Sequence, residues 1–83
     1  MNFIAEIDVM PLKELLDPQG KAVAAGLKNL KLDAITDVRV GKHITLKLEA
    51  ADKATATAQA ELACQKLLTN RVIEYFTFEV KEA

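Results

Sequence analysis

Cysteine, serine and aromatic residues are scarce in this 83-residue chain, and each scarcity excludes a class of protein. A single cysteine, Cys64, excludes a disulfide framework within one chain and a cysteine-rich zinc site. The chain has three Phe, one Tyr and no Trp, so a sheet has few aromatic side chains on which nucleic-acid bases could stack, which disfavours an RNA-recognition sheet. Because neither a disulfide within the chain nor a cysteine-rich zinc site stabilises so small a core, we expect association with another chain to supply part of the stability.

The chain also lacks an excess of charge of either sign and a long apolar run. Eleven basic and twelve acidic residues give a net charge of -1, so the chain lacks the positive electrostatic field that attracts nucleic acid or an anionic membrane. The first residues lack the basic start of a signal peptide, and no segment approaches the roughly 20 apolar residues of a membrane span. We therefore expect a cytoplasmic, soluble, single domain over residues 1–83, with no nucleic-acid or membrane partner.

Groups for catalysis are few: one histidine, one cysteine and no serine. Cys64 falls on the apolar face of a predicted helix, where a small buried thiol is expected. His43 falls on the polar face of a predicted strand, and Glu6 and Asp8 share an exposed face of another, where we assign them no acid–base role. We expect no catalytic, cofactor-binding or metal-ligating residues.

Apolar periodicity predicts the first strand and the first helix. Residues 3–9 alternate apolar and polar side chains until Met10 and Pro11 end the strand. After a loop over residues 12–16, a helix is predicted from Pro18 to about Leu30, and we expect its narrow apolar stripe to lie on the sheet. The stripe consists of Val23, Leu27 and Leu30.

The next segment, Thr36 to Leu48, carries its apolar residues on even positions, interrupted at Gly41 and Lys42. Two structures keep them on one face: a long strand bent at Gly41 and Lys42, or a hairpin of odd loop length centred on Gly41. We favour the long strand. Such a strand outruns its neighbours, which predicts pairing with a strand from a second chain.

A second helix is predicted from Lys53 to about Thr69, with Asp52 as its N-terminal cap and Asn70 as a left-handed stop. Its expected core face is Ala56, Ala60, Ala63, Cys64 and Leu67. The last strand spans Val72 to Lys81, and its core face holds Phe76, Phe78 and Val80. The order β-α-β-α-β predicts an α+β fold with the helices on one face of the sheet.

The start of the first helix contains two glycines that propensity does not explain. Asp17 and Pro18 suit the cap and the first helical position. Gly20 and Gly26 each cost the helix about 1 kcal/mol relative to Ala. Either the helix packs closely on a sheet, or the backbone of a partner or ligand approaches it. The residues alone favour packing.

Residues Arg39 to His43 form the main basic cluster. A phosphate site is one interpretation, but the spaced glycines and the Ser or Thr of a phosphate-binding loop are missing, so we favour a salt-bridged interface surface. Combined with the helix start, the cluster gives a candidate subunit interface of Asp17, Pro18, Gln19, Gly20, Arg39, Gly41, Lys42 and His43.

Three motifs resemble the PurS family: LDPQGKAV over residues 16–23, DVRVGKHITL over 37–46, and CQKLL-TN-VIE over 64–74. The resemblance runs over essentially the whole chain, although Arg71 replaces the proline usual in the family. It implies a non-catalytic small subunit of phosphoribosylformylglycinamidine synthase. In that family the subunit bridges a glutaminase subunit and a large ATP-dependent synthetase subunit and supports ammonia passage between them.

The resemblance also implies an α+β fold similar to ferredoxin-like folds, and pairing into dimers or tetramers. It reverses the preference at Gly20, so that we expect a partner to approach there. The rival hypothesis is a ferredoxin-like regulatory module that binds a small molecule, which predicts ligand-dependent thermal stabilisation of the isolated protein.

Overall fold

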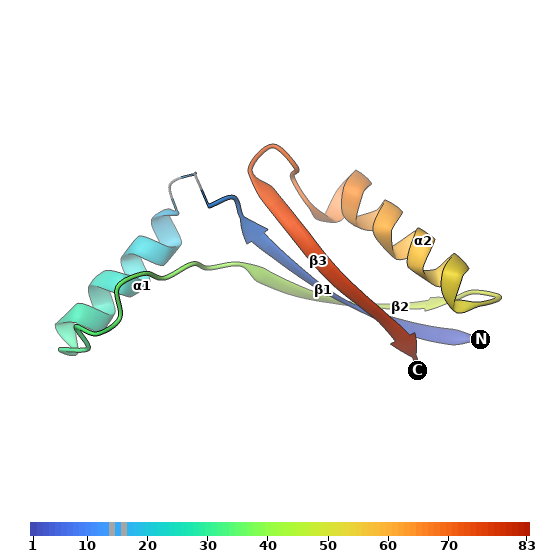
Figure 1. Ribbon diagram of the computed structural model, residues 1–83, viewed down its shortest axis with the longest axis horizontal. Coiled ribbons are helices and arrows are strands. Elements are labelled where there is room, and N and C mark those ends of the chain that lie inside the picture. The colour runs from blue at the N-terminus through green and yellow to red at the C-terminus, as the bar shows by residue number, and fades with distance from the viewer. Residues whose placement is uncertain (14, 16) are drawn as a thin grey trace.

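The computed structural model describes residues 1–13, 15 and 17–83 (Figure 1). Positions 14 and 16, which belong to the predicted loop over 12–16, lie outside the described residues. The elements in chain order are β1 (Asn2–Pro11), α1 (Pro18–Asn29), β2 (Lys42–Glu49), α2 (Lys53–Ala63), the π-helix η1 (Cys64–Leu68) and β3 (Glu74–Glu82). In the part of the chain so described, neither α-helix has the length and hydropathy to cross a bilayer.

The three strands of the described residues form one antiparallel sheet in the order β2-β1-β3. Alternation along β1 buries one face completely, and Ile7 lies there between Ile44 of β2 and Phe78 of β3. Helix α2 covers this face with small residues, which bring its backbone close to the strands. The core comprises Phe3, Ala5, Ile7, Val9, Ala56, Ala60, Cys64 and Val80. The α+β fold is confirmed, and so are the core faces of β1 and β3 and that of β2 from Ile44 to Leu48. Val38 and Val40, predicted on the same face, lie outside the sheet and its core.

Helix α2 begins as predicted, with Asp52 accepting a hydrogen bond from the Thr55 N–H at 2.8 Å. Its C-terminal end differs from the prediction, because η1 adds one residue to the last turn and the Thr69 N–H donates to Cys64 O. The wider turn places Leu68 toward the core and leaves Leu67 84% exposed. The prediction of Leu67 as a core residue is therefore wrong.

Asn70 does not adopt a left-handed conformation, so that prediction is also wrong. Its side-chain Oδ1 accepts from the Val72 N–H at 3.2 Å, and its carbonyl accepts from the Ile73 and Glu74 N–H groups. Asn70 thus organises the turn into β3 through side-chain and backbone hydrogen bonds.

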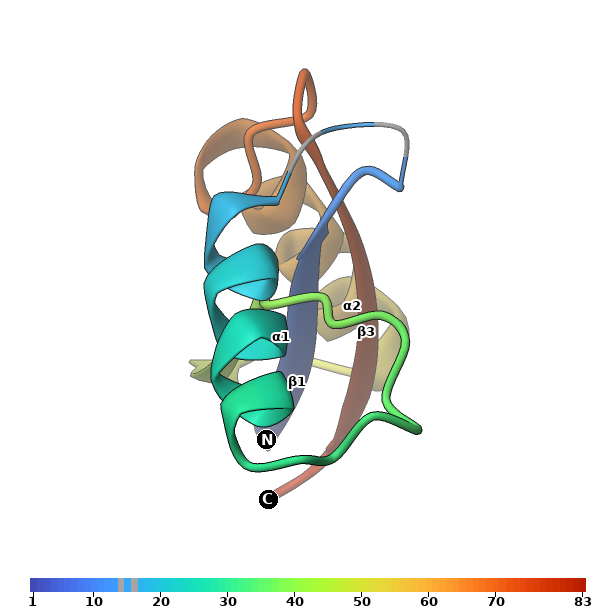
Figure 2. The ribbon, with the colours of Figure 1, turned by 90° about the vertical axis from the view of Figure 1, so that its left-hand side faces the viewer.

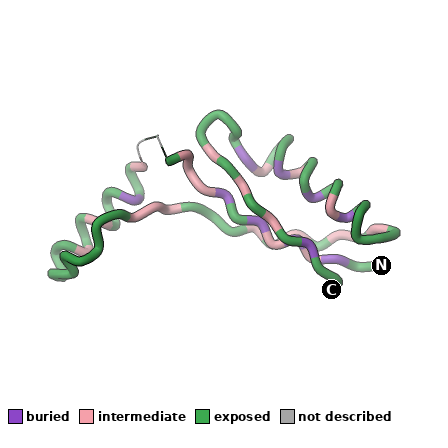
Figure 3. The backbone as a smooth tube through the Cα atoms, in the orientation of Figure 1, coloured by how far each residue is buried: buried purple, intermediate pink, exposed green. Residues whose placement is uncertain are grey.

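Helix α1 lies beyond the end of the sheet and not across its face (Figures 1 and 2). Its bounds agree with the prediction, but its apolar stripe is largely uncovered: Val23 is 45% and Leu30 is 69% exposed, and Leu27 between them is half-buried. Gly20 is its one buried residue, and Figure 3 shows the rest of the helix as mostly exposed. The expectation that α1 packs on the sheet of its own chain is wrong.

The predicted long strand is also shorter than expected, because β2 begins at Lys42 and residues 36–41 belong to no strand. In the β1–β2 register Lys42 pairs with Val9, so the next positions outward would place Val40 beside Pro11. Proline has no N–H to donate, which ends the ladder. Residues 36–41 instead run in extended form beside α1 (Figure 1).

The detached helix makes the chain elongated. Its radius of gyration is 16.4 Å and its extents are 51 × 26 × 14 Å, whereas a compact chain of this length has a radius of gyration of about 12 Å. We call residues 18–41, which comprise α1 and the segment that returns from it, the arm.

Candidate functional site

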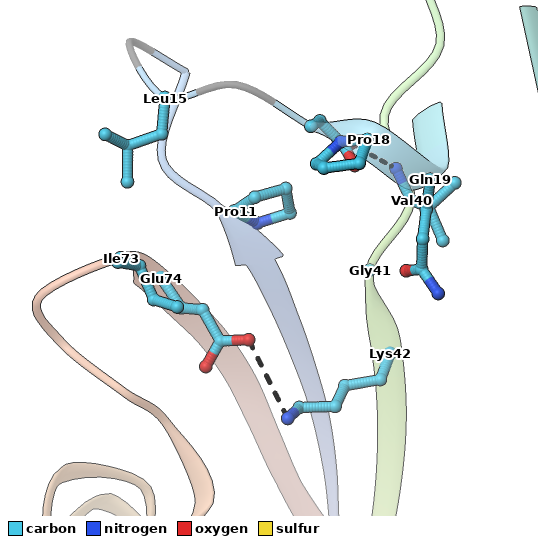
Figure 4. A pocket seen from close by; sticks show the side chains of 10 residues that line it. Pro11, Leu15, Pro18, Gln19, Val40, Gly41, Lys42, Ile73 and Glu74 are labelled. Atoms are coloured by element: carbon cyan, nitrogen blue, oxygen red, sulfur yellow. Dashed lines mark hydrogen bonds and ion pairs between the residues drawn. The ribbon is translucent and has the colours of Figure 1, made fainter. Parts of the chain in front are cut away.

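Seven of the eight predicted interface residues gather where the arm meets the sheet, and His43 lies apart from them on the sheet. This junction comprises residues 11–13, 17–20, 38–42 and 73–74, and it surrounds an open pocket of about 370 Å³ (Figure 4). Leu15 and Ile73 contribute apolar side chains to the pocket, and Lys42 and Glu74 contribute charged ones. Five of the predicted interface residues line it: Asp17, Pro18, Gln19, Gly41 and Lys42.

Asp17 holds two elements together at the junction. Its Oδ1 accepts from the Gly20 N–H at 3.0 Å, which caps α1 as predicted. Its Oδ2 accepts from the Val40 N–H, also at 3.0 Å. The hydrogen bonds from Gly20 and Val40 hold the pKa of the Asp17 carboxyl below its ordinary value. The same carboxylate therefore stabilises the start of α1 and the return of the arm.

Arg39 ties the returning segment to the end of β1. Its Nη2 donates to the carbonyl oxygens of Pro11 and Leu12 at 2.9 and 2.6 Å, and its Nη1 donates to that of Lys13 at 3.2 Å. Its Nε lies 3.9 Å from Asp17 Oδ2. A guanidinium group suits this role because its donors spread across one plane and reach several acceptors together.

Both glycines of the junction allow close backbone packing within the chain. A Cβ at Gly20 would collide with the Val38 carbonyl oxygen, and a Cβ at Gly41 would collide with the Val9 carbonyl oxygen. The backbone that approaches Gly20 is therefore the arm's own returning segment. The expectation of a partner's backbone at Gly20 is corrected, since contacts within the chain account for the glycine.

The remaining cations of the basic cluster are also paired within the chain. Lys42 Nζ lies 3.7 Å from Glu74 Oε2. His43 lies on the sheet face opposite α2, where its Nδ1 is 2.7 Å from Asp8 Oδ1 and its Nε2 is 2.6 Å from Glu6 Oε2. These hydrogen bonds, first to Asp8 and then to Glu6, raise the pKa of His43. The pairing agrees with the salt-bridged interpretation of the cluster.

Sequence reasoning missed the partners Glu6, Asp8 and Glu74. The alternation along β1 did place Glu6 and Asp8 on one exposed face, but only the antiparallel register sets Asp8 opposite His43. That register depends on which strands pair, which the local pattern does not specify.

The described residues show neither an activated nucleophile nor a cluster of metal ligands. Cys64 is buried, and burial raises the pKa of its thiol, which makes it a poor nucleophile. Among residues 1–13, 15 and 17–83, no group of three or more His, Cys, Asp or Glu side chains is placed to hold a metal ion. The polar groups of the junction stabilise the structure of the chain itself.

Fold and junction together define a small α+β protein whose charged side chains fix an extended arm and whose arm helix is left uncovered. The family model of PurS, described as phosphoribosylformylglycinamidine (FGAM) synthase, matches residues 4–82. The chain belongs to the PurS family.

Individual relatives support this assignment. PurS of Synechocystis sp. is 50% identical over 66 residues, which cover 80% of this chain and 66% of that protein. PurS of Bacillus subtilis is 43% identical over 72 residues, covering 86% and 84%. A chain in the structure of PurLQS from Thermotoga maritima superposes with a TM-score of 0.89 at 31% identity, covering 98% of this chain and 99% of that one.

Proposed function

We propose that this chain is the small, non-catalytic subunit of phosphoribosylformylglycinamidine synthase and that it bridges the glutaminase and synthetase subunits. The observation that carries the proposal is the nearly complete superposition on a chain of the PurLQS structure, whose name joins PurS to PurL and PurQ. The shortage of catalytic groups and the buried thiol agree with a positional role. Holding two active sites in register favours transfer of ammonia over its loss to water.

Self-association into a dimer or tetramer is part of the proposal. Its support is the uncovered stripe of α1 together with the elongated shape, because a helix with an apolar face gains stability only when another surface covers that face. A second copy offers suitable surfaces at its own arm and at the half-buried apolar side chains of its sheet, such as Ile44 and Phe76. We also propose that residues 1–83 act as one domain in the cytoplasm.

The candidate subunit interface keeps all eight predicted residues but with divided roles. His43 is exposed on the sheet face opposite α2, outside the junction. Pro18, Gln19 and Lys42 are exposed around the pocket and are proposed to meet a larger subunit. Asp17, Gly20, Arg39 and Gly41 act on the chain itself and shape that surface.

Reconstitution with purified subunits tests the function. The chain alone should show neither glutaminase nor synthetase activity. Added to the glutaminase and synthetase subunits of the same organism, it should restore turnover that depends on glutamine, with ammonia-dependent turnover by the synthetase as the control. Equal glutamine-dependent rates with and without this chain would contradict the proposal.

A further inference from the structure

The link between the arm and the sheet depends on two oxygens of one side chain. Helix α2 shows what a cap alone requires: Asp52 Oδ1 accepts from the Thr55 N–H at 2.8 Å, and the described contacts of that carboxyl stay within the first turn. Asp17 makes the equivalent bond to Gly20 and then uses its other oxygen for the Val40 N–H, 23 residues away in the chain. The second bond contributes nothing to capping and joins the two ends of the arm.

Arg39 extends the same link to the sheet. Its three hydrogen bonds to the carbonyl oxygens of residues 11–13 fasten the returning segment to the end of β1. Those carbonyls lie where the β1–β2 ladder has stopped, so the guanidinium group supplies donors that strand pairing no longer provides. Arg39 is partly buried, with 24% of its side chain exposed, which limits screening by water of its part-buried bonds to Pro11 and Leu12.

The rest of the arm has little to hold it in one direction. Val23 and Leu30 are exposed, and a Cβ at Gly26 would meet open space. A helix without an apolar partner surface is oriented by the contacts at its base, and here these are Asp17, Gly20 and the segment from Val38 to Val40.

We infer that Asp17 and Arg39 are positioning residues that fix the direction of the arm relative to the sheet, and that association with a second copy of this chain requires this direction. The inference rests on the self-association part of the proposed function. Its physical basis is preorganisation: an arm already held in its bound direction loses less conformational freedom when it docks.

Two serine substitutions separate the two functions of Asp17, which are capping α1 and linking the arm to the sheet. In Asp17→Ser the hydroxyl oxygen still caps α1, but the second oxygen that reaches Val40 is gone. Asp52→Ser makes the same change at α2, where the described bonds of the carboxyl go only to Thr55 in the first turn, and is the matched control. Arg39→Lys weakens the link between the arm and the sheet without changing a helix cap. One ammonium group cannot replace the several donors of the planar guanidinium group.

The arm's direction is measured by the distance between spin labels at Asn29→Cys and Lys47→Cys. Both positions are exposed, whereas Cys64 is buried and escapes labelling. Labelled protein is diluted into unlabelled protein so that each distance lies within one chain. Self-association of unlabelled variants is measured by sedimentation over a range of concentrations.

We expect Asp17→Ser and Arg39→Lys to broaden the distance distribution and to weaken self-association by about tenfold or more. Asp52→Ser should leave both unchanged. Distributions as narrow as that of the unsubstituted chain would overturn the inference, and so would self-association no weaker than in Asp52→Ser. If the unsubstituted chain is monomeric, the proposed self-association itself has failed. The distances would then still show whether Asp17 and Arg39 fix the direction of the arm.

Discussion

Gly20 and Gly26 occupy the same helix but have different surroundings. A Cβ at Gly20 would meet the Val38 carbonyl oxygen, whereas nothing lies near the equivalent position at Gly26. Each alanine gains about 1 kcal/mol of helix propensity, but at Gly20 the collision costs about 1–3 kcal/mol. We therefore expect Gly20→Ala to lower the free energy of unfolding by up to about 2 kcal/mol and Gly26→Ala to raise it by about 0.5–1 kcal/mol.

Denaturant titration of the two variants checks this prediction. The pair is internally controlled, because both changes add one methyl group to the same helix. A Gly20→Ala protein as stable as the Gly26→Ala protein would show that Val38 moves away freely and would return Gly20 to an intermolecular role.

His43 makes stability depend on pH. The hydrogen bonds to Asp8 and Glu6 raise its pKa above the value of about 6.5 found in unfolded chains. The stabilisation is therefore complete below pH 6.5 and is lost as the pH rises through the higher pKa of the folded protein. We expect His43→Gln to destabilise the chain more at pH 5.5 than at pH 9.

The measurement is the free energy of unfolding of both proteins at the two pH values, with Lys47→Gln as a control at an exposed position on the same face of β2. An equal difference between His43→Gln and the unsubstituted chain at both pH values would contradict the raised pKa. The alternation of β2 predicts from sequence that His43 is exposed, but the two carboxylates beside it come from strand pairing.

At the scale of elements, local signals predicted how helices begin better than how they end. The caps Asp17 and Asp52 were both correct, because a cap depends on residues three positions apart. The end of α1 uses Lys31 in a left-handed conformation, with a φ of 63°. The Leu32 N–H donates to Leu27 O and the Lys31 N–H to Lys28 O, the hydrogen bonds of a Schellman motif that usually has glycine at this position.

We expect Lys31→Gly to raise the free energy of unfolding by about 1 kcal/mol, since glycine adopts this conformation without a Cβ clash. The melting temperature should rise by roughly 4–8 °C. Lys28→Gly is the matched control: it makes the same exchange inside α1 and should destabilise by about 1 kcal/mol. A destabilised Lys31→Gly protein would indicate that the Lys31 side chain contributes more than its strained backbone costs.

At the scale of the whole molecule, the sequence predicted the sheet and its covering helix but not the position of α1. The stripe Val23, Leu27 and Leu30 correctly marks an apolar face, yet periodicity does not say whether the surface it meets belongs to the same chain. Likewise, the alternation of residues 36–48 begins before β2, which starts only at Lys42 because the ladder stops where its partner strand reaches Pro11. The elongated shape, with a radius of gyration of 16.4 Å, follows from both features.

If a second copy covers this stripe, a charge placed on it should weaken self-association. Burying a valine side chain stabilises by about 1.5–3 kcal/mol, so we expect Val23→Glu to raise the dissociation constant by roughly tenfold or more. Ala25→Glu adds the same charge to an exposed position on the opposite side of α1 and should leave association unchanged. Sedimentation over a range of concentrations distinguishes the two. Equal association of both variants would place the interface elsewhere, whereas weakening by Val23→Glu alone identifies the uncovered stripe as the surface that the second copy covers.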